Sequence, residues 1–466
     1  MPTISSGISI ALQAVLTQSQ VLEIAGHNIA NASTPGYRRQ SAVLVTDTPT
    51  SINGADHLLG AGQRGGGVTI AKIQRFNLSF FDGRYRSVSA EAKNWEAQSG
   101  ILSQLEATLA ENTDDGLLTK MDEFWAGWQS LSNDPTNTSL RTILLDDASA
   151  LATAFNRRTT QITQLRSDQN QVVASQVEEI NSLAGQVAQL NGEISRVLSV
   201  GEQPNDLMDT RDIALDRLAE LTGAVSTEQK NGEMMVSVGG HVLVVGHDSF
   251  NLETRANLTD TSIKDVYWQD GQRLIPTTGE LKGTLEVRDQ VLTGQLSGLN
   301  TLASGLITQV NAIHTTGFGL NNATGLNFFN GTDAASIAVN PALDAASIAT
   351  SSATGQEGNN VIALQIAGLK SVKGMSAGTA TLNEFYNAQI TQLGVTTQRA
   401  ANNAYQHGLV GKALSDQRES VAGVSLDEEA ANMAKAQKAY QAAARVLTAY
   451  DEMLDLIINN MGLVGR

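Results

Sequence analysis

The two ends of this 466-residue chain carry apolar residues at helical spacing, and this matched pattern constrains the fold more than any other feature. Near the N-terminus apolar residues recur every seven positions, at Ile8, Val15, Leu22 and Ile29. Near the C-terminus they step by three and four: Met433, Ala436, Tyr440, Ala443, Leu447, Tyr450, Leu454, Ile457, Met461 and Val464. Such spacing lines up one face of an α-helix, and an apolar face needs a partner. Each terminal helix is therefore expected to pack within the chain or against neighbouring copies.

Local sequence patterns predict where both terminal helices stop and start. The first helix is expected to end near Asn31, because the segment 33–36 (STPG) places Pro and Gly where a tight turn needs them. The last helix is expected to begin near Leu426. Ser425 followed three residues later by Glu428 forms a capping box, in which each residue satisfies free backbone N–H groups of the first turn.

Most of the chain between these ends also has a helical pattern. No proline occurs from Ser139 to Leu198, and apolar residues there alternate by four and three, with Asn191 as the polar member of the seam. Asn191 could fix the register of a coiled coil or lie at a partly wet edge. Further helices are expected over 88–109, 117–131 and 285–313. The expected bundle core contains four aromatic residues at helical spacing: Trp95, Phe124, Trp125 and Trp128.

The expected β structure is limited to short segments and one inserted region. Extended segments are predicted at 42–45 and 68–73. Over 224–284, short β-prone runs are separated by dipeptides that favour hairpin turns. These dipeptides are Asn231-Gly232, Gly239-Gly240 and Asp270-Gly271. The region 224–284 is therefore predicted to form a small antiparallel β module.

Composition argues against several classes of partner. The 47 Asp and Glu residues outnumber the 31 Lys and Arg residues, and a net charge of -16 repels nucleic acid and anionic lipid. The chain has no cysteine, so disulfides, thiolate nucleophiles and cysteine metal sites are absent. We found no continuous apolar run approaching the roughly 20 residues that span a bilayer, and expect no membrane insertion. Residues 1–35 contain one charged side chain, Glu23, so a cleaved signal peptide is not expected either.

Two residue groups have the spacing of a chemical site. Three glycines and one acid fit a dinucleotide-binding loop: Gly60, Gly62, Gly65 and Asp82. That loop should open a helix, whereas the strand-like segment 68–73 follows here, so a surface loop is the better interpretation. His241 and His247 could share one face of a strand, but a metal site needs a further ligand. We therefore predict no enzymatic activity, cofactor or metal.

Two motifs at opposite ends of the chain carry a family resemblance. The segment 26–40, GHNIANASTPGYRRQ, resembles the N-terminal motif shared by flagellar rod, hook and hook-associated proteins. The segment 421–447 resembles the C-terminal helix of the same family. The segments 66–81 and 205–221 are most similar to the hook-associated branch that joins hook to filament. The resemblance covers 1–223 and 381–466 and is weak between them.

The resemblance implies a folded-back, mainly α molecule with an inserted antiparallel β module. Its terminal helices would pair as a coiled coil in an inner domain, residues 1–75 with 420–466. A long helical bundle would form a rod from 76–223 and 285–419. The outer β domain would comprise 224–284.

The resemblance also implies a function. The chain would be a structural axial subunit, exported by the flagellar type III apparatus without a cleaved signal and placed outside the cell at the hook–filament junction. Its partners would be copies of itself, the hook protein below, the next hook-associated protein above, and an export chaperone. The expected assembly surface is Ile8, Val15, Leu22 and Ile29 against Tyr440, Leu447, Leu454 and Ile457. The expected turn is shaped by Asn28, Asn31, Pro35, Gly36 and Tyr37.

Three alternatives stay open at this point. Another axial subunit of the hook, rod or filament would share the terminal helices, although the segment 205–221 weighs against it. A secreted coiled-coil effector or adhesin would not need motifs at both ends. An enzyme would be favoured by tight nucleotide binding to the purified chain.

Overall fold

The computed structural model describes residues 2–48, 65–76, 79–109, 111 and 115–460. The chain is mostly helical with small antiparallel sheets, as predicted. It divides into two compact units, each built from segments that are distant in sequence. The first unit comprises Met1–Ser89, Ile180–Asn251 and Leu409–Arg466, and the second comprises Ala90–Glu179 and Leu252–Gly408. These units group the chain differently from the three domains expected from the sequence, which stay a prediction.

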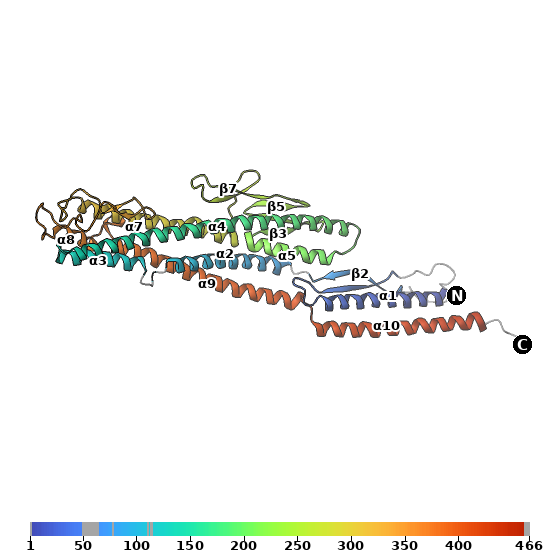
Figure 1. The fold of residues 1–466 in the computed structure, drawn as a ribbon. Helices are drawn as coiled ribbons and strands as arrows, with labels where there is room; N and C mark the ends of the chain where they lie inside the picture. The colour runs from blue at the N-terminus through green and yellow to red at the C-terminus, as the bar shows by residue number, and fades with distance from the viewer. Residues whose placement is uncertain (1, 49–64, 77–78, 110, 112–114, 461–466) are drawn as a thin grey trace. The chain divides into compact units, whose positions relative to one another are not determined.

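The α-helices of the described residues include those predicted over 88–109, 117–131, 139–198 and 285–313, and also helices over 205–222, 361–368 and 382–422, for which no range was predicted (Figure 1). They are α1 (Pro2–Ala30), α2 (Ser79–Leu109), α3 (Leu117–Asn133), α4 (Thr138–Ser199), α5 (Asn205–Thr222), α6 (Glu280–Glu286), α7 (Thr293–His314), α8 (Val361–Gly368), α9 (Leu382–Ala422) and α10 (Leu426–Asp455). A π-helical stretch, Val287–Leu292, joins α6 to α7, and a second one, Leu456–Asn460, continues α10.

The first helix ends, and the last helix begins, within one residue of the predicted position. α1 stops at Ala30, and Gly36 in the following turn has a φ of 76°, a conformation that suits glycine. α10 begins at Leu426, and the Ser425 side chain accepts a hydrogen bond from the Glu428 backbone N–H. The predicted seam residues Met461 and Val464 lie outside the described residues.

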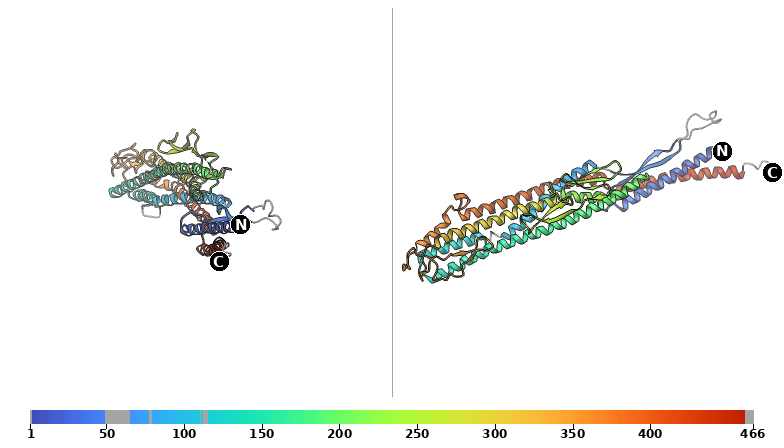
Figure 2. Two further views of the ribbon diagram at one scale, coloured as in Figure 1. Left: turned by 90° about the vertical axis from the view of Figure 1, so that its right-hand side faces the viewer. Right: turned by 90° about the horizontal axis from the view of Figure 1, so that it is seen from above.

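α1 and α10 run side by side in opposite directions (Figures 1 and 2). A two-stranded antiparallel sheet of β1 (Gln40–Thr46) and β2 (Val68–Arg75) also packs on α1. The Thr17 hydroxyl donates a hydrogen bond of 3.0 Å to the Val68 carbonyl of β2. α1 therefore packs against both α10 and the β1–β2 sheet of the first unit.

α1 corrects one expectation about membranes. Over Ile4–Ala30 the helix is long and apolar enough to cross a bilayer by length and composition. We missed it because its apolar residues are interrupted by Ser, Gln and Gly, while its charged residue is Glu23 alone. Core helices of soluble proteins have the same composition but are mostly buried, whereas 22% of the apolar window of α1 is buried, with α10 packed along it. The absence of membrane insertion stays a prediction.

The predicted β module is two separate sheets. The first contains β3 (Val225–Glu228), β4 (Met234–Val238), β5 (His241–Val245) and β6 (Asp248–Ser249). The second pairs β7 (Leu252–Ala256) with β8 (Lys264–Trp268). A further small ladder joins β9 (Phe329–Asn330) to β10 (Ala338–Val339). The dipeptide Gly239-Gly240 forms the predicted two-residue turn between β4 and β5, with φ of 58° and 88°.

Asn191 and Asn170 of α4 each hold one of the two sheets by hydrogen bonds. Fully buried Asn191 donates to the carbonyls of Met234 and Gly246 at 2.8 Å and accepts from the Met234 N–H at 2.9 Å. The first sheet is thereby attached to the last turns of α4. Asn170, in the second unit, instead accepts from the Lys264 N–H at 2.8 Å. Asn191 therefore anchors a sheet to a helix, a role that neither sequence interpretation included.

The core of the second unit contains the predicted aromatic residues. Phe124, Trp125 and Trp128 of α3 are buried, with Phe328 and Phe329 packed against Phe124. Trp95, also predicted for this core, is partly buried against the same cluster.

Candidate functional site

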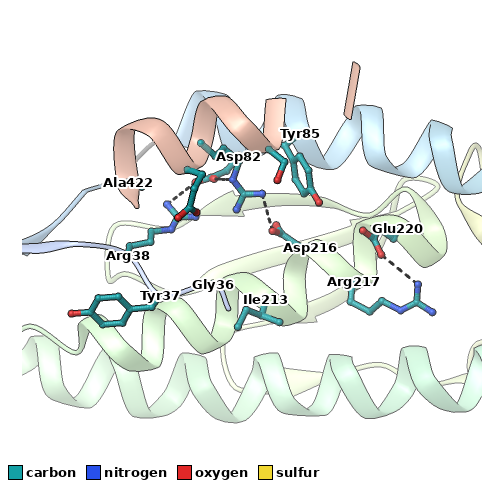
Figure 3. Close-up of a pocket in the computed structure, with 13 residues that line it drawn as sticks. Gly36, Tyr37, Arg38, Asp82, Tyr85, Ile213, Asp216, Arg217, Glu220 and Ala422 are labelled. Atoms are coloured by element: carbon teal, nitrogen blue, oxygen red, sulfur yellow. Dashed lines mark hydrogen bonds and ion pairs between the residues drawn. The ribbon is translucent and has the colours of Figure 1, made fainter. Parts of the chain in front are cut away.

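A buried ion-pair network lies where the turn after α1 meets α2, α5 and the end of α9 (Figure 3). We call it the terminal network. It consists of four arginines and four aspartates within the first unit: Arg38, Arg75, Arg86, Arg418, Asp82, Asp209, Asp212 and Asp216. None of these side chains is more than 21% exposed. Charges removed from water in this way are stable only when they are paired.

The pairing within the terminal network is continuous. Arg38 contacts Asp82 at 2.9 Å and Asp212 at 3.2 Å. Asp212 also contacts Arg75 at 2.8 Å and Arg86 at 3.2 Å. Further pairs close the ring, with Arg75–Asp209 at 2.7 Å, Arg86–Asp216 at 2.6 Å, and Arg418 at 3.0 Å from both Asp82 and Asp216. Every member therefore has an oppositely charged neighbour.

The network keeps Asp212 ionised. Burial by itself would raise the pKa of Asp212, but Arg75, Arg38 and Arg86 together hold that pKa below its ordinary value. Asp209 behaves differently, because burial raises its pKa and its bonds from Arg38 and Arg75 offset this only in part. Asp212 is thus the electrostatic centre of the terminal network, ion-paired with three guanidinium groups.

Asn28 organises the turn that leads into this network. Its side chain accepts from the Gln40 N–H at 3.0 Å and from the Tyr37 hydroxyl at 2.8 Å. It also donates to the Gln40 carbonyl at 2.9 Å and to Glu429 at 3.1 Å. With 1% of its surface exposed, Asn28 links the turn, β1 and α10.

The other predicted turn residues shape the chain around Asn28. Asn31 donates to the His27 carbonyl and accepts from the Thr34 hydroxyl, so its bonds are local. Gly36, which follows Pro35, lies so close to Ile213 of α5 that a Cβ atom would come within 2.6 Å of that side chain. Burial beside Asp206, Asp209 and Glu429 raises the pKa of Tyr37, so its hydroxyl stays protonated and donates to Asn28.

Arg39 connects this turn to the start of α10. It donates to Glu429 and to Glu428, each at 2.7 Å. The Glu428 carboxylate therefore bonds Arg39, rather than returning to Ser425 as a full capping box would require. Ser425 still caps the helix through its side chain.

Sequence reasoning missed the residues of the terminal network. One pattern could have revealed part of it, since Asp209, Asp212 and Asp216 step by three and four along α5 and so share one helical face. Their arginine partners come from distant segments, which no local pattern brings together.

The predicted assembly residues of α1 and α10 are less buried than the residues of a protein core usually are. Ile8, Val15, Leu22 and Ile29 are half-buried, as are Leu447, Leu454 and Ile457. Tyr440 is exposed, and the buried residues of α10 are Glu429 and Ala436. Packing of α1 on α10 therefore leaves much apolar surface of both helices uncovered.

The residues considered for chemistry do not form a site among the described residues. Asp82 belongs to the terminal network, and β2 follows Gly65, while Gly60 and Gly62 lie outside the described residues. His241 is in β5, and His247 follows that strand. Within the described part of the chain, no group of three His, Asp or Glu side chains is placed to hold a metal.

Known proteins resemble this chain along its whole length. Residues 102–329 match the model of the flagellar hook-associated protein FlgK helical domain, and residues 417–461 match the flagellar basal body rod FlgEFG protein C-terminal model. Flagellar hook-associated protein 1 of Bacillus subtilis is 30% identical over 99% of both chains. Its counterpart in Escherichia coli is 24% identical over 98% of this chain and 100% of the relative.

A solved structure supports the fold. The flagellar hook junction protein FlgK from Burkholderia pseudomallei superposes with a TM-score of 0.66 at 16% identity, covering 73% of this chain and 100% of that one. The match to the Bacillus subtilis protein, at 30% identity, covers 99% of this chain and 99% of that one. The chain therefore belongs to the flagellar hook-associated protein 1 family.

Proposed function

We infer that this chain is a structural protein of the hook–filament junction of the bacterial flagellum, and we propose that it polymerises at the hook tip through α1 and α10. Family membership supports a structural role in the flagellum. The proposed neighbours are copies of the same chain, the hook protein below and the next hook-associated protein above. The inner domain, residues 1–75 with 420–466, would be the polymerising part, and its two helices would form a coiled coil.

The uncovered apolar surface of α10 is the observation that carries this proposal. Met453 is 53% exposed, and beyond it Leu456 and Ile458 are 63% and 72% exposed. On α1, Leu12 and Leu16 are also exposed. Exposed apolar residues repeated along helices mark an interaction surface. Neighbouring copies would cover these residues and bury the half-exposed seam of Ile8, Val15, Leu22 and Ile29 against Tyr440, Leu447, Leu454 and Ile457.

Export and assembly are proposed to be coupled. The subunit would leave the cell unfolded through the flagellar type III apparatus, escorted by a chaperone and without a cleaved signal. A terminal pair with few buried residues has little to hold it in the free chain. We propose that α1 and α10 become fully ordered when subunits stack.

A paired substitution tests the assembly surface. Leu456→Glu with Ile458→Glu puts two charges among the exposed apolar residues at the end of the C-terminal helix, where burial between copies would be costly. Cells that carry this variant as their only copy should lose filaments, while the purified chain should keep its thermal unfolding midpoint. Leu258→Glu is the matched control, because Leu258 is 92% exposed in the second unit. Normal filament numbers in the double variant would contradict the proposal.

The nearest alternative is another axial subunit of the flagellum. It shares a terminal helix pair, but the match of residues 102–329 to a hook-associated helical domain favours the junction protein. Electron microscopy of cells labelled at this chain would separate the two, since a hook or rod subunit would be found along those structures.

A further inference from the structure

Gly7 of α1 lies directly against the ring of Tyr450 of α10. A Cβ atom built on Gly7 would stand 2.3 Å from Tyr450 Cζ and 2.6 Å from its hydroxyl oxygen. Real Cβ atoms do not approach other atoms so closely, so any larger residue at position 7 must displace the tyrosine ring. Glycine inside a helix costs about 1 kcal/mol relative to alanine. The place of Gly7 is therefore explained by the room that it gives to Tyr450.

A second contact between the same helices lies at their other end. Asn28 donates to Glu429, and both side chains are almost completely buried. Gly7 and Asn28 are 21 residues apart on α1, and Glu429 and Tyr450 are also 21 residues apart on α10. Equal intervals are required if both contacts belong to one antiparallel register. An interval of 21 residues is three heptads, so both contacts fall on the same helix faces.

Residues between these contacts agree with that register. A groove of about 430 Å³ is lined by α1, β1 and α10. Val21 and Ala25 of α1 line it opposite Ala436 and Asn432 of α10. Each of these pairs satisfies the same offset as the contacts at the two ends. Ala25 and Ala436 are both 3% exposed, which marks the closest part of the interface.

We propose that Gly7–Tyr450 and Asn28–Glu429 act together as a register lock that sets how α1 is aligned on α10. A shift by one heptad would remove the Tyr450 ring from its glycine. It would also leave Asn28 and Glu429 without each other in a buried place, and unpaired buried polar groups are costly. A single buried Asn is known to select one register in coiled coils. Tyr450 and Gly7 favour the same register sterically, because the ring fits only where α1 has a glycine.

The consequence concerns assembly and rests on the proposed function. The alignment of α1 on α10 determines which exposed apolar residues of the two helices lie beside each other on the outer surface. Leu12 and Leu16 of α1 and Met453 of α10 are exposed, and their spacing along the helix pair is set by this register. A copy with a shifted register would present a different surface to its neighbours.

Engineered cysteines test the lock, because the chain contains none of its own. Ile4→Cys with Met453→Cys reports on the end near Gly7, and Gln18→Cys with Ala439→Cys reports on the middle of the pair. Gln18→Cys with Asn432→Cys reports a slip of one heptad. A short bismaleimide would be applied to purified full-length chain and to isolated flagella. Products linked within one chain would be separated by mass from those linked between chains.

The lock predicts crosslinking of the first two pairs and not of the third. Adding Gly7→Ala should lower the yield of the crosslink between positions 4 and 453 at least fivefold, or prevent assembly. A further substitution, Tyr450→Ala, in the same chain should restore the crosslink or the assembly. Gly26→Ala is the matched control in the same helix, because a Cβ atom there meets nothing within 4 Å. Unchanged crosslinking in the Gly7→Ala variant would overturn the proposal.

The result separates the lock from the proposed function. If none of the pairs crosslinks in the parent chain although filaments are attached normally, the register lock is wrong and the assembly role stands. If the parent crosslinks as expected but the charged variant of Leu456 and Ile458 still assembles, the lock stands and the proposed surface is wrong.

Discussion

Asn28 and Glu429 lie 401 residues apart in the sequence and share a hydrogen bond of 3.1 Å. This bond connects the end of the first helix to the start of the last. Arg39 strengthens the connection, since it donates to Glu429 at 2.7 Å. The first and last helices are therefore held together in the first unit by a small set of buried polar contacts.

Asn28→Ala should destabilise the first unit by about 2–4 kcal/mol. The substitution removes the bonds of Asn28 to the Gln40 N–H and to Glu429 and leaves His27 as the neighbour of the Tyr37 hydroxyl, and each buried group left unpaired costs about 1–3 kcal/mol. Urea unfolding followed by circular dichroism measures the change. Asn31→Ala is the control, because its bonds are local and solvent-accessible, and it should cost less than 1 kcal/mol. Equal effects of the two substitutions would argue against a central role for Asn28.

Asp212→Asn should be among the most damaging single substitutions in the first unit. The Asp212 carboxylate bonds Arg38, Arg75 and Arg86, and its removal leaves buried positive charge uncompensated. Breaking a buried ion pair in this way costs about 3–5 kcal/mol. Asp206→Asn is a matched control on the same helix, since Asp206 is largely exposed. A loss below 1 kcal/mol for Asp212→Asn would show that the network is not stabilised by charge pairing.

Asn191→Leu should detach the four-stranded sheet from α4 while leaving the helix formed. The substitution removes three bonds to β4 and Gly246 and the bond that Arg211 donates to Asn191. Hydrogen exchange should therefore become faster in β3–β6 and stay slow in α4. Gln189 is an exposed neighbour of Asn191 on the same helix, and Gln189→Leu should leave the exchange rates of both the sheet and the helix unchanged. Unchanged exchange in the sheet would mean that other contacts hold it.

His314 should make the second unit less stable in acid. Burial lowers its pKa from 6.5 to about 4, and its Nε2 accepts a hydrogen bond from the Ala349 N–H, which requires the neutral ring. The unfolded chain binds the proton more tightly, so stability is full above pH 6.5 and falls as the pH drops toward 4. The loss over this window is about 3 kcal/mol.

Urea unfolding at several pH values would measure this loss through the fluorescence of Trp128, whose ring centroid is 6.3 Å from that of His314. His314→Gln should be less stable than the parent at pH 7 but should lack most of the slope between pH 6.5 and 4. A parent protein with no slope in that window would contradict a buried neutral His314.

The ends of α1 and α10 could be predicted because the residues that set them are local. Gly36 and Ser425 determine a turn and a cap through contacts within a few positions in the sequence. The turn at Gly239-Gly240 was predictable for the same reason. The attachment of the two sheets to α4 could not be predicted in the same way, because the partners of Asn191 and Asn170 are far along the chain.

The terminal network illustrates the same limit. Asp212 and Asp216 share a face of α5, which the sequence shows. Their partners Arg38, Arg86 and Arg418 come from a turn, from α2 and from α9. Charged residues are ordinarily exposed, so their burial follows only from the way these segments meet.

Hydrogen exchange over 2–30 and 426–455, measured on the free chain and on isolated flagella, tests the central claim most directly. The claim is that α1 and α10 are the assembling elements of a junction subunit and are fully ordered by contact with neighbouring copies. It predicts that both segments of the free chain exchange faster than the core of the second unit, and that both become strongly protected after assembly. Equal protection of α1 and α10 in the two samples would contradict it.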